Sequence, residues 1–217
     1  MRYIVANWKQ NKTLDKALLW CKDFVRLVGD MDLKNVTPII CPSAPFLEKL
    51  AGESALGMEL AVQDISPYAD GAHTGFVGIN QVKQFCRYAL VGHSERRESR
   101  DVVMEKISQC LHADIVPIVC FKSSTDYQII KGAIYALEDP DNISVDGVYR
   151  PKNSHEVQNL VYEAKNFFGG ESTIIYGGSV NTENAESLAS ISNLDGVLVG
   201  NASLNPLEFV DIVKKFL

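Results

Sequence analysis

Eight short apolar segments alternate with amphipathic stretches along the 217 residues, and this alternation constrains the fold more than any other feature. The segments are rich in β-branched residues and continuously apolar, which is typical of strands buried on both faces in a parallel sheet. We therefore predict strands at residues 3–7, 37–41, 59–63, 88–91, 115–120, 134–138, 173–176 and 196–199.

The stretches between the predicted strands carry helical periodicity. The first is the clearest, because its apolar residues share one face and Gly29 can end the helix: Leu14, Ala17, Leu18, Cys21, Val25 and Val28. Similar patterns predict helices at residues 79–86, 102–113, 154–168, 182–191 and 206–216.

Strands that alternate with helices fit either a closed barrel or an open, doubly wound sheet, and periodicity alone does not choose between them. The polar and glycine-rich residues cluster directly after the strands, however, and only a barrel brings all these points to one face. We therefore predict an α/β chain folded as one (β/α)8 barrel domain over residues 1–217. The short connection between Cys120 and Glu138 leaves room for a stunted outer helix of at most about two turns, around residues 125–131.

Composition narrows the classes of partner. The formal net charge of −6 opposes a broad nucleic-acid surface. No apolar run approaches the roughly 18 residues of a membrane span, and the N-terminal segment turns polar too early for a signal peptide. The five cysteines are irregularly spaced and lack a CxxC pair, so we expect reduced, buried cysteines in a cytoplasmic protein and no metal site.

Several motifs after the predicted strands carry a family resemblance that covers essentially the whole chain. They read Ala-Asn-Trp-Lys at 6–9, Gly-Ala-His-Thr-Gly at 71–75, Val-Gly-His-Ser-Glu-Arg-Arg at 91–97, Tyr-Gly-Gly-Ser-Val at 176–180 and Asp-Gly-Val-Leu-Val-Gly at 195–200. In this order the sequence resembles the triosephosphate isomerase family. The resemblance implies a TIM barrel that interconverts dihydroxyacetone phosphate and glyceraldehyde 3-phosphate through an enediolate, without a cofactor, as a cytoplasmic homodimer in glycolysis and gluconeogenesis.

The resemblance also implies roles for three catalytic residues. Glu138 is the expected base, His93 the neutral electrophile that polarises the carbonyl, and Lys9 the cation near the developing oxyanion. Ile143 and Pro151 fall five and thirteen positions after Glu138, where the family has an isoleucine that closes over the base and a proline that starts the next helix. The resemblance implies a helix that starts just after His93. The positive end of its dipole disfavours the imidazolium form and should keep the ring neutral.

Further expected contacts follow from the same resemblance. Asn7 and Glu95 should support Lys9, and Thr74 should reach the partner subunit from a long polar loop. The substrate and its phosphate should be held by side chains and backbone amides that are spread over three loops: Ile143, Ser144, Ser179, Leu198, Gly200 and Asn201.

The chain departs from the family in its lid, where Ile-Gly-Thr-Gly is replaced by Ile143-Ser144-Val145-Asp146. The lost glycines and the added negative charge predict weaker phosphate binding. Phe76 stands where the family has a glutamate that pairs with the arginine matching Arg96. Two alternatives remain open: a low-activity or non-catalytic homologue that binds phosphorylated ligands, and a different phosphate-binding barrel enzyme.

Overall fold

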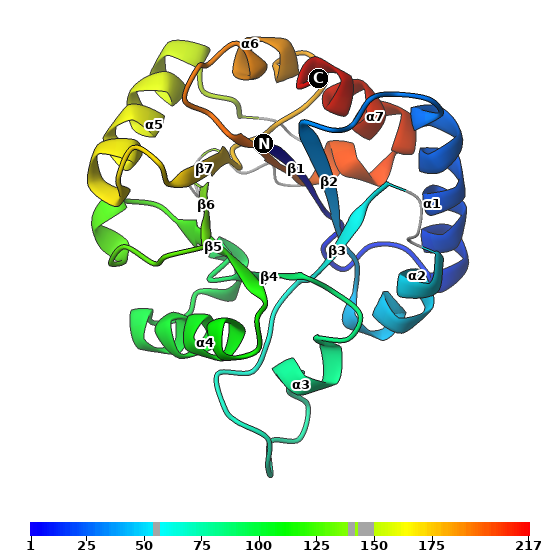
Figure 1. Ribbon diagram of the computed structural model, residues 1–217, viewed down its shortest axis with the longest axis vertical. Helices are drawn as coiled ribbons and strands as arrows, with labels where there is room; N and C mark the ends of the chain where they lie inside the picture. Colours follow the sequence, from blue (N-terminus) through cyan, green and yellow to red (C-terminus); the bar gives the residue numbers. More distant parts are fainter. Residues whose placement is uncertain (54–56, 139–141, 143–149) are drawn as a thin grey trace.

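The computed structural model describes residues 1–53, 57–138, 142 and 150–217. Eight parallel strands form a closed barrel in which each strand pairs with its sequence neighbours and β1 pairs with β8 (Figure 1). The strands are β1 Arg2–Asn7, β2 Val36–Cys41, β3 Glu59–Val62, β4 Tyr88–Val91, β5 Val116–Phe121, β6 Ile134–Leu137, β7 Thr173–Tyr176 and β8 Gly196–Val199. The predicted (β/α)8 barrel is confirmed, and every predicted strand overlaps an observed one.

Alternation along the strands divides the core into two parts. In β1, Val5 belongs to one buried cluster, whereas Ile4 and Ala6 belong to the other. Because successive side chains of a strand point to opposite faces, the first cluster fills the barrel and the second packs beneath the outer helices. Both faces are therefore dry, as the continuously apolar strands predict.

The outer helices follow the strands in order around the barrel (Figure 1). They are α1 Leu14–Val28, α2 Leu47–Glu53, α3 Ile79–Val82, α4 Arg100–His112, α5 Ser154–Phe168, α6 Ala185–Ala189 and α7 Pro206–Lys215. Helix α1 has the predicted bounds, because the Thr13 side chain caps its start and Gly29 takes a positive φ of 45° at its end. Helix α5 also has the predicted bounds, with a capping box between Asn153 and Glu156.

Several connections differ from the prediction. Between β5 and β6 the expected short α-helix is replaced by a single 3-10 turn, η3 Ser124–Asp126. Asp126 accepts backbone N–H bonds from Lys122 and Ser123, which closes this turn locally, and the chain leaves it extended at Tyr127. The outer helix is therefore stunted, as predicted, and the observed turn is shorter than the limit of about two turns.

Three helices were also misjudged. Helix α3 stops at Val82 and α6 spans fewer residues than predicted, whereas α2 was not predicted at all. The sequence features that indicate α2 are Leu47 and Leu50 on one buried face and the i,i+4 pair Lys49–Glu53. Pro151 lies three residues before α5 rather than in its first turn.

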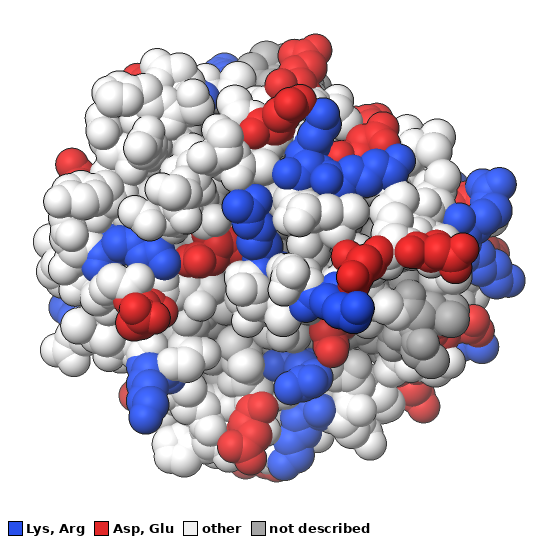
Figure 2. All heavy atoms as spheres, turned by 45° about the horizontal axis from the view of Figure 1, so that its top comes forward, with Lys and Arg blue, Asp and Glu red and all other residues white. Residues whose placement is uncertain are grey.

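The segment 63–78 between β3 and α3 leaves the barrel as a long loop, at the bottom of Figure 1. Figure 2 shows basic and acidic side chains intermixed over one face. All five cysteines are free and buried. Within the described residues, no helix is long and apolar enough to cross a membrane.

Candidate active site

The carboxyl ends of the strands bring three polar side chains into one small pocket. Lys9 follows β1, His93 follows β4 and Glu138 follows β6, and all three line the same cavity. The remaining described lining comes mostly from the β7 and β8 ends: Asn7, Gly177, Ser179, Val180, Leu198 and Gly200. The residues predicted to act together therefore meet, because parallel strands of a barrel end on one face.

His93 and Glu138 are buried and in direct contact. Nε2 of His93 lies 3.2 Å from Oε1 of Glu138, and the two side chains are 7% and 4% exposed. On the other side of the ring, the backbone N–H of Glu95 donates to Nδ1 over 3.2 Å. A nitrogen that accepts a hydrogen bond carries no proton, so the neutral ring holds its proton on Nε2, facing the carboxylate.

The electrostatics around His93 oppose one another. Burial is the largest influence and lowers the pKa of His93, but the hydrogen bond and charge of Glu138, with the charge of Glu95, raise that pKa above its usual 6.5. His93 caps the start of the turn η2 Ser94–Arg96, and the Glu95 amide of this turn lies on the ring, as predicted. This amide opposes protonation of the ring, whereas the carboxylate of Glu138 favours it.

Lys9 is held in a strained backbone conformation. Its φ is 51°, which is unfavourable for a residue with a side chain. The Asn7 side chain accepts the Lys9 N–H over 3.0 Å, and Gln63 Nε2 donates to the Lys9 carbonyl over 2.8 Å. The ammonium group pairs with Glu95 Oε1 at 2.6 Å.

Gln63 was missed as a site residue by the sequence analysis. Its Nε2 bridges the Lys9 and Cys41 carbonyls, each at 2.8 Å, and so ties the ends of β1 and β2 together. Gln63 follows directly after β3, so the rule that singled out the polar residues after the other strands applies to it as well.

The predicted phosphate-binding residues are only partly described. Ser179 Oγ donates to the Asn142 carbonyl over 2.6 Å and accepts the Arg150 N–H over 3.0 Å, with a φ of 50° at Ser179. Leu198 and Gly200 line the pocket, and Asn201 begins the turn η5 Asn201–Leu204. Ile143, Ser144 and the rest of the predicted lid at 143–146 lie outside the described residues.

Glycine at position 177 is required by the close approach of the base. A Cβ built on Gly177 would stand 2.9 Å from Cγ of Glu138, closer than real side chains come. The absent side chain therefore leaves room for Glu138 between β6 and β7.

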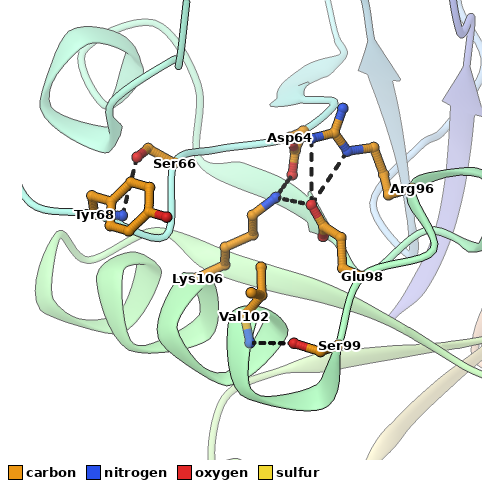
Figure 3. Close-up of polar contacts among 8 residues, drawn as sticks. All are labelled: Asp64, Ser66, Tyr68, Arg96, Glu98, Ser99, Val102 and Lys106. Atoms are coloured by element: carbon orange, nitrogen blue, oxygen red, sulfur yellow. Dashed lines mark hydrogen bonds and ion pairs between the residues drawn. The ribbon is translucent and has the colours of Figure 1, made fainter. Parts of the chain in front are cut away.

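A charged network supports the loop that carries His93 and Glu95 (Figure 3). Lys106 of α4 is 1% exposed and contacts Asp64 and Glu98, the latter at 2.6 Å. Arg96 Nη2 pairs with Asp64 at 2.9 Å and with Glu98 at 3.3 Å. Arg96 thus finds its carboxylates within its own chain, which removes the need for a glutamate at Phe76.

Phe76 instead belongs to an exposed aromatic group on the loop 63–78. Tyr68 stacks on His73 with ring centroids 4.4 Å apart, and Phe76 meets Tyr68 edge-on at 5.5 Å. Thr74 lies exposed in the same loop. Among the described residues, no group of His, Cys, Asp or Glu has the arrangement of a metal site.

A buried carboxylate against a histidine, with a lysine beside them at the carboxyl ends of the strands, defines a (β/α)8-barrel enzyme with an acid–base site. The triosephosphate isomerase family model matches residues 2–129 and 124–216. The chain therefore belongs to the triosephosphate isomerase family.

Individual relatives agree with this assignment. Triosephosphate isomerases of Alkalilimnicola ehrlichii and Aquifex aeolicus are each 31% identical to the chain, over 97% and 99% of its length and 96% and 99% of theirs. That of Thermus thermophilus is 29% identical over 97% of both chains. The alignments run over 244 to 249 positions, more than the 217 residues here, so the chain lacks short segments that these relatives have.

Proposed function

We propose that the chain interconverts dihydroxyacetone phosphate and glyceraldehyde 3-phosphate by proton transfer between adjacent carbons. The observation that carries the proposal is the contact of Glu138 with His93 inside a pocket that Lys9 also lines. A general base, a hydrogen-bond donor for the carbonyl and a cation for the developing oxyanion are the groups that this reaction needs.

Each group has a defined step. Glu138 takes a proton from the carbon beside the substrate carbonyl, and the negative charge moves to the carbonyl oxygen of the enediolate. His93 donates its Nε2–H to that oxygen, while the Lys9 ammonium stabilises the charge. Glu138 then returns the proton to the former carbonyl carbon. His93 Nε2 gives its proton to the former carbonyl oxygen and takes one from the neighbouring hydroxyl, which becomes the new carbonyl, so no cofactor or redox partner is needed.

Substrate binding must separate the two buried groups. His93 cannot donate to a carbonyl while Nε2 points at Glu138, so the carboxylate turns toward the substrate carbon as the carbonyl takes its place. The phosphate end is assigned to Ser179, Gly200 and Asn201, with Ser144 from the lid, because backbone amides at turns bind anions well. Ile143 and Leu198 are assigned to the apolar cover of the base and substrate.

A coupled assay tests this function. Purified protein is given glyceraldehyde 3-phosphate, and the dihydroxyacetone phosphate formed is reduced by an auxiliary dehydrogenase. We expect turnover that falls by about 10²–10⁴-fold in Glu138→Gln, the range of general-base contributions. Absence of turnover in the unchanged chain, with retained binding of a phosphorylated ligand, would favour the non-catalytic alternative.

We also propose a homodimer formed through the loop 63–78, in a cytoplasmic protein. Tyr68 and Phe76 are 50% and 48% exposed on this loop, and aromatic side chains are favoured at the centre of interfaces. Thr74 would reach the Lys9 region of a second copy. Sedimentation should give a dimer that Phe76→Ser weakens. Leu19→Ser, which changes a 59% exposed apolar residue on α1, should not weaken it.

A further inference from the structure

A second cavity lies against the candidate base. Its volume is about 190 Å³, and of the described residues it shares only His93 and Glu138 with the pocket of Lys9. It is bounded by the segment after β4 and by the β5–β6 connection, where η3 takes the place of an outer helix. Exposed Arg97 and Lys122 stand among its lining residues, so the cavity reaches the surface.

Three buried side-chain oxygens of residues that line this cavity have no hydrogen-bond partner within the described part of the chain. They are Oγ of Ser94, Oε2 of Glu98 and Oε2 of Glu138. The Glu138 side chain is 4% exposed, and the thiol of Cys120, a weak donor, lies beside its carboxylate. Buried polar oxygens of this kind need a partner, and a polar cavity larger than about 10–15 Å³ can hold water that supplies it.

The two carboxylate oxygens of Glu98 differ in their partners. Its Oε1 holds both Lys106 and Arg96, as Figure 3 shows. The side chain of Lys106 is 1% exposed, so this ion pair is anchored in the protein rather than in solvent. Oε2 of Glu98, a residue that lines the cavity, is left as an acceptor with no partner among the described residues.

We propose that this cavity is a water site that links the carboxyl group of Glu138 to solvent, and that it is the route by which a proton held on Glu138 exchanges during turnover. The inference rests on the isomerase activity and on the role of Glu138 proposed above. Ser94 and Glu98 hold the water, and the opening beside Arg97 and Lys122 renews it.

The exchange step is balanced in protons and charge. While the substrate is an enediolate, Glu138 carries the abstracted proton as a carboxylic acid. A cavity water accepts that proton from the carboxyl oxygen and returns one of its own, so one O–H bond breaks and another forms. Glu138 then delivers a solvent proton to the substrate carbon in place of the original one.

Turnover in D2O tests this route. Product formed from unlabelled triose phosphate carries hydrogen when Glu138 passes the original proton on, and deuterium when the proton has exchanged; proton NMR of the product measures the two. We expect both isotopes in product from the unchanged chain, and a loss of deuterium at equal conversion in Ser94→Ala and in Glu98→Gln.

Asp64→Asn is the matched control, since Asp64 also holds Lys106 and Arg96 but does not line the cavity. Its product should keep the deuterium content of the unchanged chain. An unchanged deuterium content in Ser94→Ala, an equal loss in Asp64→Asn, or product without deuterium from the unchanged chain would each overturn the route. If Glu98→Gln does not fold, the deuterium content of product from Ser94→Ala alone tests the route. A chain that isomerises no triose phosphate overturns the proposed function, and this inference falls with it.

Discussion

Nε2 of His93 and Oε1 of Glu138 lie 3.2 Å apart, so the two groups assigned to the substrate contact each other in the unliganded chain. Nε2 of His93 and Oε1 of Glu138 are thereby paired, whereas Oε2 of Glu138 has no hydrogen-bond partner among the described residues. The contact also couples their protonation, because the carboxylate of Glu138 favours the charged imidazolium.

The first prediction concerns the protonation of His93. Burial alone lowers the pKa of this ring, and Glu138 raises it above 6.5. Glu138→Gln should therefore move the NMR titration midpoint of His93 downward, with the signal assigned by its loss in His93→Gln. An unchanged or higher midpoint would mean that Glu138 is not the cause of the shift.

The contact between His93 and Glu138 should also make the free energy of unfolding depend on pH. Because the pKa of His93 is raised in the folded chain, the contact stabilises the fold below pH 6.5, and this contribution is lost as pH rises through the raised value. Urea unfolding of the unchanged chain and of Glu138→Gln should show a larger difference at pH 6 than at pH 9.

The second prediction concerns the space beside the base. Gly177→Ala places a Cβ about 2.9 Å from Cγ of Glu138, so the base must shift. A displacement of about 1 Å in a reacting group can cost on the order of a hundredfold in rate, so kcat/KM should fall by that order. Gly170→Ala is the control, because a Cβ there meets nothing within 4 Å. Equal kinetics in the two variants would show that Glu138 is not confined by Gly177.

The third prediction concerns Gln63. Gln63→Met keeps the length of the side chain but removes the donor to the Lys9 and Cys41 carbonyls. Loss of a partner for a buried carbonyl costs about 1–3 kcal/mol of unfolding free energy, and less for partly buried ones such as these. Lys9 should also lose its position, so kcat/KM should fall too. The same change at exposed Gln128 should alter neither quantity in urea unfolding and steady-state assays.

The parts of this fold that depend on local sequence patterns were predicted best. The strands and helix α1 were clear because apolar runs and caps such as Thr13 and Gly29 act locally. For the β5–β6 connection the chain length gave only an upper limit on the helix, and the observed turn is shorter because the carboxylate of Asp126 closes it. Helix α2 has too few turns for its periodicity to stand out.

The site shows the same division. The motifs located Lys9, His93 and Glu138, but no pattern in the sequence indicates that Gln63 bridges two strand ends or that Arg96 finds Asp64 and Glu98. Such contacts depend on which loops the closed barrel brings together. They join residues far apart in the chain, for which periodicity carries no information.

The fourth prediction concerns the lid sequence. Ser144 and Asp146 stand in the sequence where the family has glycines, and the family resemblance implies that the charge of Asp146 comes near the phosphate. Ser144→Gly combined with Asp146→Gly should lower KM or raise kcat/KM, because it removes repulsion and frees the backbone. Asp146→Ser separates the effect of charge from that of flexibility. An unchanged or lower kcat/KM in the double variant would mean that this lid is adapted to its own residues.

The most direct test of the account is the steady-state kinetics of Glu138→Asp, with circular dichroism to show that the fold is retained. Shortening the side chain withdraws the carboxylate by about 1 Å while keeping its charge, which should reduce kcat on the order of a hundredfold. KM should change much less, because the phosphate contacts come from other loops. Activity close to that of the unchanged chain would contradict the assignment of Glu138 as the base.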